Sequence, residues 1–497
     1  MSAQRTVPPD IERRVFDVIV IGAGINGAGI ARDAAMRGLD VLLLEKHDIG
    51  SGTTAASTRL IHGGLRYLEH AELGLVRESL RERETLLRIA PHLVRPLPFL
   101  LPIYNWHERG PKTIRAGMVA YDLFSARKRL PRHQMLSTAH TRSAAPGLAP
   151  QGLRGAARYY DAQVTFPERL ALENALDAAA YGATIVTHAA VERVNIRERL
   201  VTSVDARSTI DDARFTVHAS TVVNATGPWA DQLLTGIDSA RLIGGTKGSH
   251  IVIERFQGAP DDAVYSEAKE DGRPFFIIPW SGWLLIGTTD TPFDSDPGDA
   301  RTTLADVDYL IRQTTAIFPS ARLTRGSVRF AYAGVRPLPM AAGRAAGATT
   351  RRHFIRHHAP RASGLYSVIG GKLTTYRDLA EGVTDLICRR VGHGDSCRTS
   401  EVTLPGFGDT TIGEGRMLAA GVRPVAIERL TSIYGARVDG LSDLIETDAT
   451  LSTPFGDDDT TLSAEVVFAV EREFAGTIAD VLLRRTMLGL RPGLGLD

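Results

Sequence analysis

The sequence predicts an α/β protein in which a discontinuous parallel-sheet domain is joined to an antiparallel α+β domain and a small helical C-terminal domain. Three observations predict this fold class. Strand-like apolar segments that end in a glycine turn occur at residues 16–24, 220–227 and 365–371. Hairpin-rich, alternating segments lie within residues 247–332. After residue 401, apolar residues recur at helical spacing.

Composition and charge are those of an ordinary globular chain. Of 497 residues, 43% are apolar and 23% charged, and 58 Lys and Arg against 57 Asp and Glu leave a net charge of +1. Nucleic-acid binding needs a large basic field, so we expect no nucleic-acid partner. Cys388 and Cys397 form no CxxC pair and cannot build a disulfide framework, which favours a reducing cytoplasm. We expect no metal site. No apolar run reaches the roughly 18 residues that span a bilayer.

The first glycine turn has the features of a Rossmann-like dinucleotide site. The run Phe16–Ile21 predicts a strand buried on both faces, and it leads into Gly22-Ala-Gly24-Ile-Asn-Gly27. A helical pattern follows to Gly38, and a second strand, Val41–Leu44, ends at Glu45. The glycines permit a tight turn, close approach of a pyrophosphate and close helix packing, and the helix N-terminus attracts phosphate. Glu45 lies where a carboxylate binds ribose hydroxyls.

The later turns favour FAD over NAD. The segment after Glu45 is small and hydroxylated instead of a further helix–strand repeat, and other strand–glycine turns occur at Ala225–Gly227 and Gly370–Leu373. Three turns so far apart in the chain fit a discontinuous domain wrapped around a long cofactor. An ATP loop is excluded because Leu373 stands where Ser or Thr must bind magnesium. We expect the last helix N-terminus to lie beside the flavin ring, where its dipole stabilises negative charge.

Three domains follow from these patterns. The antiparallel domain contains a hairpin of Phe275–Ile278 and Trp283–Ile286, a helix that starts at the capping box Thr303–Asp306, and the strand Val328–Tyr332. Ala464–Val470 and Ile478–Leu483 have helical spacing. The FAD-binding domain is assigned to residues 14–70, 150–246 and 352–395, the substrate-binding or cap domain to residues 71–149 and 247–351, and the helical domain to residues 400–497.

Six motifs give the sequence a resemblance to a known family. They are Ser57–Glu69, Asn224–Trp229, Lys247–His250, Gly287–Asp290, Ala333–Leu338 and Gly370–Arg377. With them the chain resembles FAD-dependent, aerobic-type glycerol-3-phosphate dehydrogenases from about Phe16 to about Leu490. The resemblance implies non-covalent FAD, a fold like that of glycine and sarcosine oxidases, and oxidation of sn-glycerol 3-phosphate to dihydroxyacetone phosphate by hydride transfer to flavin N5. It also implies that the electrons pass on to a membrane quinone.

Candidate substrate residues follow from this chemistry and from the resemblance. A substrate phosphate requires a clamp, and the planar fork of arginine binds two oxygens at once. Arg336 is the first candidate, with a structural tie between strands as the alternative reading. Arg351 is the second, although Arg352 follows it where the family has an acid, so the choice between the two stays open. The resemblance also places Arg66, Tyr67 and Lys372 against the substrate, while Tyr67 fits a core aromatic equally well.

For the hydroxyl proton we favour His250 as the acceptor and His62 as the second choice. A histidine pKa near 6.5 suits base chemistry at neutral pH, although His62 fits a turn residue beside the flavin equally well. Lys372 can stabilise a developing alkoxide or the flavin N1/O2 edge. The catalytic set is therefore His250, Arg336, Lys372 and His62. The cofactor-binding set is Gly22, Gly24, Ile25, Asn26, Gly27, Glu45, Thr53, Thr54, Ser57, Thr58, His62, Gly63, Gly64, Val191, Ala225, Thr226, Gly227, Trp229, Gly371, Lys372, Leu373 and Thr374.

One stretch, Lys112–Arg129, suggests contact with an anionic membrane surface. It carries Ile114, Met118, Tyr121 and Phe124 at near-helical spacing with basic residues around them. This pattern fits an interfacial helix, and it fits a core-packed helix with a solvated basic face equally well. The resemblance favours the membrane, because relatives reduce a membrane quinone. We therefore expect a cytoplasmic protein, peripheral on the inner membrane, with a homodimer as the assembly considered.

Two other function classes share the cofactor motifs. An FAD-dependent amine or amino-acid oxidase of the same fold would need a carboxylate clamp and would gain nothing from several arginines gathered at a phosphate. A non-catalytic flavin-binding scaffold would need no polar cluster at all. The substrate that reduces the flavin distinguishes the three.

Overall fold

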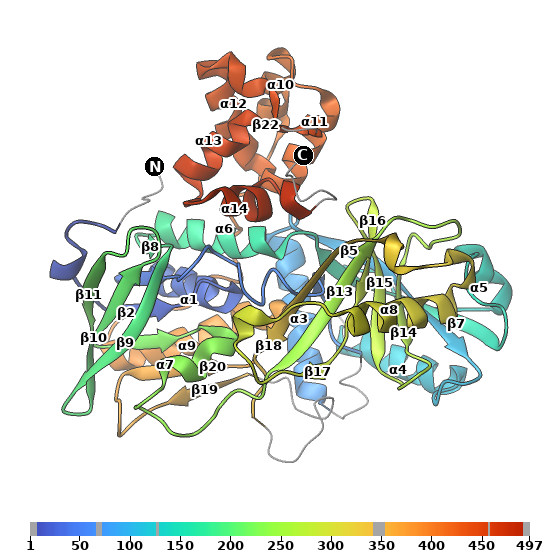
Figure 1. Ribbon diagram of the computed structural model, residues 1–497, viewed down its shortest axis with the longest axis horizontal. Helices are drawn as coiled ribbons and strands as arrows, with labels where there is room; N and C mark the ends of the chain where they lie inside the picture. The colour runs from blue at the N-terminus through green and yellow to red at the C-terminus, as the bar shows by residue number, and fades with distance from the viewer. Residues whose placement is uncertain (1–6, 66–71, 126–128, 341–352, 456–457, 491–497) are drawn as a thin grey trace.

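The computed structural model describes residues 7–65, 72–125, 129–340, 353–455 and 458–490. Two β-sheet bodies lie side by side, and the C-terminal helices sit above them in the view of Figure 1. The first body contains a six-stranded and a four-stranded sheet, and the second contains a ten-stranded sheet. The predicted fold class, an α/β domain with an antiparallel domain and a helical C-terminal domain, is confirmed.

The six-stranded sheet is the centre of the first body. Its order is β19-β20-β12-β2-β3-β8, parallel except for β19 at the edge. Val18 and Val20 of β2 pack against helices, whereas Ile19 and Ile21 pack toward the four-stranded sheet. Burial on both faces explains the continuous apolar runs in the sequence. The strands are Val18–Ile21 (β2), Val41–Leu44 (β3), Thr184–Val186 (β8), Val222–Asn224 (β12), Phe354–His357 (β19) and Leu365–Ile369 (β20).

Helices and a second sheet cover the two faces. α1 (Ile25–Met36) packs against both α6 (Pro167–Ala180) and α9 (Tyr376–Val391). On the other face lies the sheet β1-β11-β10-β9. Its strands are Val15–Phe16 (β1), Ala189–Arg197 (β9), Leu200–Ser208 (β10) and Arg214–Ala219 (β11).

The single strand predicted over Phe16–Ile21 is wrong in one respect. The structure divides the run at Asp17, so that β1 pairs with β11 while β2 enters the six-stranded sheet. Asp17 donates its backbone N–H to the carbonyl of Asp40 and accepts the Asp40 N–H on its carboxylate, each at 2.9 Å. These two bonds replace strand pairing at this residue and let the chain change sheets.

The ten-stranded sheet forms the second body. Its order is β17-β13-β16-β15-β14-β5-β7-β4, with β18 paired to β13 and β6 paired to β7. β5 and β7 are paired over almost their whole length. The strands are Leu60–Ile61 (β4), Val94–Tyr104 (β5), Gln134–Leu136 (β6), Leu153–Val164 (β7), Thr246–Ile253 (β13), Ala263–Glu267 (β14), Pro274–Trp280 (β15), Trp283–Gly287 (β16), Thr291–Pro292 (β17) and Val328–Arg336 (β18).

Two segments assigned by sequence to the FAD-binding domain therefore belong to this second sheet. β4 lies within residues 14–70 and β7 within residues 150–246, yet both are hydrogen-bonded into the ten-stranded sheet. The reason is that β5 is a long antiparallel partner for the backbone groups of β7. A domain boundary predicted from local sequence patterns does not take this distant pairing into account.

Local predictions in the second body are close to the structure. α8 (Leu304–Ile317) begins with the capping box of Thr303 and Asp306, which confirms the predicted helix start. The predicted hairpin is longer than expected, because β15 continues through Trp280 and leaves a two-residue turn of Ser281 and Gly282, both with positive φ. β18 likewise continues four residues past the predicted end at Tyr332 and reaches Arg336.

The C-terminal domain is helical, with one short hairpin, Pro454–Phe455 (β21) and Asp458–Leu462 (β22), that the sequence does not predict. The segment predicted as a helix over Ile478–Leu483 is α14 (Ile478–Asp480) followed by a wider turn over Val481–Arg485. The other helices are α10 (Thr411–Ala419), α11 (Pro424–Tyr434), α12 (Val438–Thr447) and α13 (Ser463–Arg472).

The helix predicted for membrane contact is α4 (Pro111–Phe124), and its apolar face lies inward. Met118 and Tyr121 are buried, and Ile114 and Phe124 pack against the same core, so the interfacial reading of these four residues is wrong. They cover the core beside α3 (Leu73–Ile89), as a core-packed helix does. Among the described residues, no helix combines the length and the apolar character that crossing a bilayer requires.

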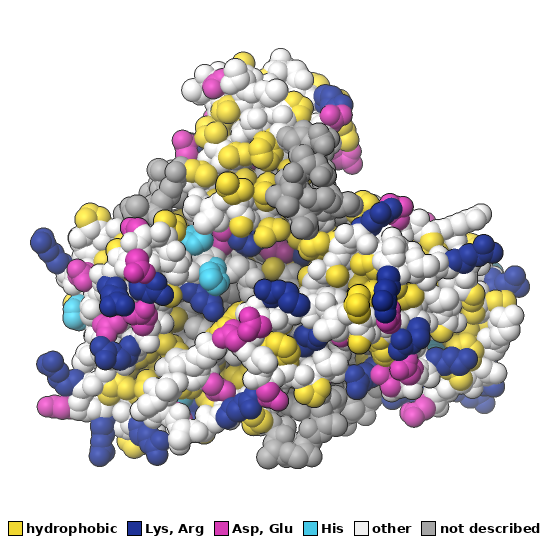
Figure 2. All heavy atoms as spheres, viewed as in Figure 1, with side chains coloured by type: hydrophobic (Ala, Val, Ile, Leu, Met, Phe, Trp, Pro, Cys, Tyr) yellow, Lys and Arg dark blue, Asp and Glu magenta, His cyan; other side chains and the backbone are white. Residues whose placement is uncertain are grey.

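Charged side chains are mixed on the face of the molecule that Figure 2 shows. Lys and Arg alternate there with Asp and Glu over both sheet bodies, in keeping with the net charge of +1.

Candidate functional site

A cavity of about 480 Å³ lies at the carboxyl ends of β2, β3 and β12, where the Gly370–Gly371 turn after β20 also reaches it. Ligands bind at this edge in parallel α/β sheets. Most of the predicted cofactor set lines it: Gly22, Gly24, Ile25, Asn26, Glu45, Thr53, Thr54, Ser57, Val191, Ala225, Thr226, Gly227, Trp229, Gly371, Lys372 and Leu373. Gly27, Thr58, His62, Gly63, Gly64 and Thr374 are outside this lining.

The first turn is shaped by close contacts that only glycine permits. Gly22 has a φ of +97°, and a Cβ there would lie 2.8 Å from the carbonyl oxygen of Ala225. A Cβ on Gly27 would lie 1.8 Å from the carbonyl oxygen of Gly22. The turn and α1 therefore pack backbone against backbone. This packing directs the N-terminus of α1, at Ile25, into the cavity.

Glu45 is fixed at the cavity wall by backbone donors. Its Oε2 accepts the N–H of Ala23 at 2.7 Å, and its Oε1 accepts the N–H of His47 at 2.9 Å. Burial raises the pKa of Glu45, and the two N–H bonds oppose that shift. Each oxygen keeps a lone pair for a further donor, so the side chain can bind ribose hydroxyls as the sequence predicts.

Several lining residues were missed by sequence reasoning. Lys46 stacks on Trp229, with Nζ 3.8 Å from the ring centroid, and burial lowers the pKa of Lys46. Its position directly after Glu45 was the available signal. From β9 the predicted set contained Val191 but not its neighbours Ala189, Ala190 and Glu192. The lining residues absent from the predicted set are Ile21, Leu44, Lys46, His47, Ser51, Gly52, Ala189, Ala190, Glu192, Pro228, Gln232, Leu233, Pro337 and Gly370.

The His62–Gly64 turn is tied to the two sheet bodies by its backbone. The N–H of His62 donates to Oγ1 of Thr374 at 3.1 Å, and Oγ1 of Thr374 donates to the carbonyl of His62 at 3.3 Å. The N–H of Gly63 donates to the Tyr121 hydroxyl at 3.0 Å, and that hydroxyl lies 2.8 Å from both oxygens of Asp161. Tyr121 of α4 thus stabilises this turn. No local sequence pattern predicts this role.

His250 is held in an apolar, aromatic environment. It is 2% exposed, its Nε2 lies 3.0 Å from Oγ1 of Thr58, and its ring stacks on Tyr332 at 4.9 Å. Burial, with the charges of Arg336 and Arg59, lowers the pKa of His250 to about 3. The ring is therefore neutral at physiological pH. Its Nδ1 is buried and makes no hydrogen bond to any residue that the structure describes.

Arg336 is already engaged with a carboxylate. Its Nη1 pairs with Oδ1 of Asp290 at 2.9 Å, and its Nη2 donates to Oγ1 of Thr288 at 2.7 Å and to the carbonyl of Thr289 at 3.1 Å. A Cβ on Gly248 would lie 2.2 Å from Nη2. The guanidinium thus joins β18 to the segment after β16, as the alternative reading of this residue expected. Its side chain remains 19% exposed.

Lys372 lines the cavity, and its Nζ donates to Oγ of Ser79 at 3.3 Å. It stands at the N-terminal end of the turn that precedes α9, as the sequence predicts for the third glycine turn. Arg66, Tyr67, Arg351 and Arg352 lie outside the described residues, so the structure says nothing of their predicted roles.

The geometry defines a class of protein. Backbone donors, a buried carboxylate and three glycine turns on a parallel sheet form a dinucleotide cavity. Pro337, which directly follows the antiparallel strand β18, also lines this cavity. Such an arrangement is that of a dinucleotide-dependent oxidoreductase.

Comparison with known proteins narrows this class. Residues 17–377 match the family model described as FAD dependent oxidoreductase, and residues 397–493 match the C-terminal domain of alpha-glycerophosphate oxidase. A glycerol-3-phosphate dehydrogenase of Synechocystis sp. is 43% identical over 97% of this chain and 90% of its own length. An aerobic glycerol-3-phosphate dehydrogenase of Staphylococcus haemolyticus is 32% identical over 97% of this chain and 88% of its own length. The chain belongs to the family of FAD-dependent glycerol-3-phosphate dehydrogenases.

Solved structures agree. The glycerol-3-phosphate dehydrogenase of Bacillus halodurans, complexed with FAD, is 30% identical, superimposes with a TM-score of 0.80, and is matched over 98% of this chain and 88% of its own. A glycine oxidase of Bacillus cereus, at 20% identity and a TM-score of 0.54, covers 77% of this chain and 99% of its own. This second likeness confirms the expected glycine oxidase-like fold and nothing more.

Proposed function

We propose that this protein oxidises sn-glycerol 3-phosphate to dihydroxyacetone phosphate. The observation that carries the proposal is the dinucleotide cavity, whose lining includes Lys372 and also Pro337 next to Arg336, in a chain whose relatives are named for this substrate. FAD, when bound, supplies the acceptor that takes a hydride at N5. The cavity fits FAD, because Glu45, the N-terminus of α1 and the first glycine turn line it where the adenosine diphosphate part of a dinucleotide binds.

The chain's own groups divide the remaining work. Arg336 supplies positive charge for the phosphate, and Asp290 and Thr288 hold its guanidinium in one orientation. Neutral His250 is in the state that accepts a proton, and Nδ1 is its buried nitrogen without a hydrogen-bond partner among the described residues. A base with a pKa of about 3 binds a proton weakly, and the charge of Arg336 contributes to that shift. A phosphate dianion beside Arg336 offsets this charge, raises the pKa of His250 and so couples substrate binding to proton transfer.

We further propose that the electrons pass to a membrane quinone at the cytoplasmic face of the membrane. The basis is the family resemblance. On α4, the outward surface that remains for a lipid contact carries Val119 and Leu123, 53% and 70% exposed, beside exposed Lys112 and Arg115. This surface replaces the inward-facing residues that the sequence suggested.

The tests use the purified flavoprotein. With sn-glycerol 3-phosphate as donor, we expect rapid reduction of a water-soluble quinone analogue and slow reduction of oxygen. Faster turnover with oxygen would contradict the quinone proposal. In a flotation assay with anionic vesicles, we expect the protein to rise with the lipid. A protein that stays wholly in the soluble fraction would contradict membrane binding and leave the substrate assignment intact.

A further inference from the structure

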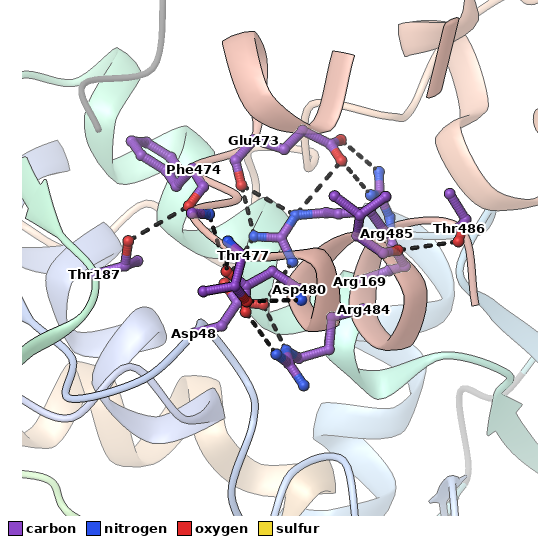
Figure 3. Close-up of polar contacts among 12 residues, drawn as sticks. Asp48, Arg169, Thr187, Glu473, Phe474, Thr477, Asp480, Arg484, Arg485 and Thr486 are labelled. Atoms are coloured by element: carbon purple, nitrogen blue, oxygen red, sulfur yellow. Dashed lines mark hydrogen bonds and ion pairs between the residues drawn. The ribbon is translucent and has the colours of Figure 1, made fainter. Parts of the chain in front are cut away.

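The C-terminal domain contacts the FAD-binding domain through a buried ionic cluster directly behind the cavity wall. Figure 3 shows carboxylates and guanidinium groups from α6, from the segment after β3 and from the C-terminal domain directed at one another. We call this set the docking cluster: Asp48, Arg169, His188, Glu473, Asp480, Arg484 and Arg485.

Asp48 connects the cluster to the cavity. It follows Glu45, Lys46 and His47, all three of which line the cavity, but Asp48 itself is fully buried on the other side of the segment. Arg485 binds its carboxylate with both terminal nitrogens, each at 2.8 Å. Arg484 adds a third contact from Nε to Oδ2 at 2.5 Å. Both arginines belong to one turn of the C-terminal domain, Val481–Arg485.

A second contact holds the neighbouring wall. Oδ2 of Asp480 lies 2.8 Å from Nε2 of His188, and the N–H of His188 donates to the carbonyl of His47 at 2.9 Å. The residues that follow His188 at the start of β9, Ala189–Val191, line the cavity. Two segments of the cavity wall are therefore held on the side away from the cavity by α14 and the turn that follows it.

The cluster is closed by a bidentate pair between Arg169 of α6 and Glu473, at 2.6 and 2.8 Å, and Arg485 also donates to the carbonyl of Glu473. Burial tends to raise the pKa of Glu473, but the positive charge of Arg169 lowers this pKa to about 2. The hydrogen bond to Asp480 raises the pKa of His188. Removal of one member of such a buried set leaves a charge without its partner, so the contact forms or opens as a unit.

We propose that the C-terminal domain controls FAD affinity through this cluster, with Asp48, Arg484 and Arg485 as positioning residues for the cavity wall. None of the seven side chains lines the cavity, so they act through the segments Glu45–His47 and Ala189–Val191. Because coupling between two events is reciprocal, FAD also tightens the docking of the C-terminal domain. The inference depends on FAD binding alone and not on the proposed substrate or electron acceptor.

The test measures FAD affinity of the apoprotein by quenching of flavin fluorescence, well below the unfolding temperature. We expect Arg485→Met to weaken FAD binding at least tenfold. Arg485→Lys should be intermediate, because it keeps the charge but loses the fork. Arg416→Met is the matched control: Arg416 lies in the same domain and pairs with Asp443 and Glu446 there, away from the cluster. It should stay within twofold of the parent protein.

A second readout follows the reciprocal effect. Hydrogen–deuterium exchange of residues 463–490 should slow when FAD is added to the parent apoprotein, and this response should be lost in the Arg485→Met variant. If that variant does not fold, the isosteric Asp48→Asn carries the same test. A folded Arg485→Met or Asp48→Asn protein with the parent FAD affinity would overturn the proposal, as would exchange in residues 463–490 that does not respond to FAD.

Discussion

The cofactor cavity and the substrate side of this protein are built by different means. Around the cavity, the shaping contacts are made by the backbone: glycines in the first turn, N–H groups that hold Glu45, and the start of α1. On the substrate side, the shaping contacts are made by side chains from distant segments, such as Arg336 with Asp290 and His250 with Thr58. Backbone shape is encoded locally, whereas side-chain pairing is decided by the fold.

The largest expected effect tests the cofactor cavity, whose shape depends on backbone contacts. Gly27→Ala places a Cβ 1.8 Å from the carbonyl of Gly22, and backbone cannot yield as a side chain does. We expect FAD affinity to fall about 100-fold, equal to about 2.7 kcal/mol. Flavin content and a fluorescence titration measure the loss. Gly382→Ala, in α9 with no atom near the added Cβ, is the control and should bind FAD normally.

The next effect tests the substrate side, whose shape depends on contacts between side chains. Arg336→Ala should lower kcat/KM for sn-glycerol 3-phosphate by about 30-fold to 3,000-fold, because breaking a buried charged contact costs about 2–5 kcal/mol. Asp290→Asn leaves the guanidinium in place but less firmly oriented, so we expect a loss of about tenfold. Steady-state kinetics with free glycerol as a second substrate distinguish a loss of phosphate binding from a general loss of folded enzyme. Equal losses on both substrates would show that Arg336 is only a tie between strands.

A smaller effect concerns pH and the buried ring of His250. The pKa of His250 is about 3 in the folded protein and about 6.5 when unfolded, so the unfolded chain binds more protons between these values. Stability therefore falls as pH decreases below 6.5, by up to about 1.4 kcal/mol per pH unit from this group. Urea unfolding of the apoprotein at pH 7 and pH 5 measures the slope. His250→Asn should flatten it, and an unchanged slope would show that other groups cause the loss.

The smallest effect concerns the outward face of α4. Replacing Val119 and Leu123 by Asp should reduce recovery with anionic vesicles a few-fold, since the change removes apolar area and adds repulsion. Thermal stability should change little, because both side chains are more than half exposed. Vesicle binding equal to that of the parent protein would place any membrane contact elsewhere.

The contrast also explains what the sequence could predict. The Gly22–Gly27 turn and the helix start at Thr303 are marked by residues close together in the chain, and Glu45 lies at a characteristic spacing after the turn. The structure has each where its local pattern indicated. The division of Phe16–Ile21 between two sheets depends on Asp40, and the place of β7 depends on β5. The inward face of α4 depends on Asp161, which its Tyr121 contacts. No local pattern contains these partners.

The central claim is that a dinucleotide cavity of this family faces a site for a phosphorylated alcohol. The most direct measurement mixes the oxidised flavoprotein, without oxygen, with sn-glycerol 3-phosphate, glycine or sarcosine and records the flavin absorbance. We predict that only sn-glycerol 3-phosphate bleaches the flavin, with dihydroxyacetone phosphate formed in equal amount. Bleaching by glycine or sarcosine, with none by sn-glycerol 3-phosphate, would contradict the account.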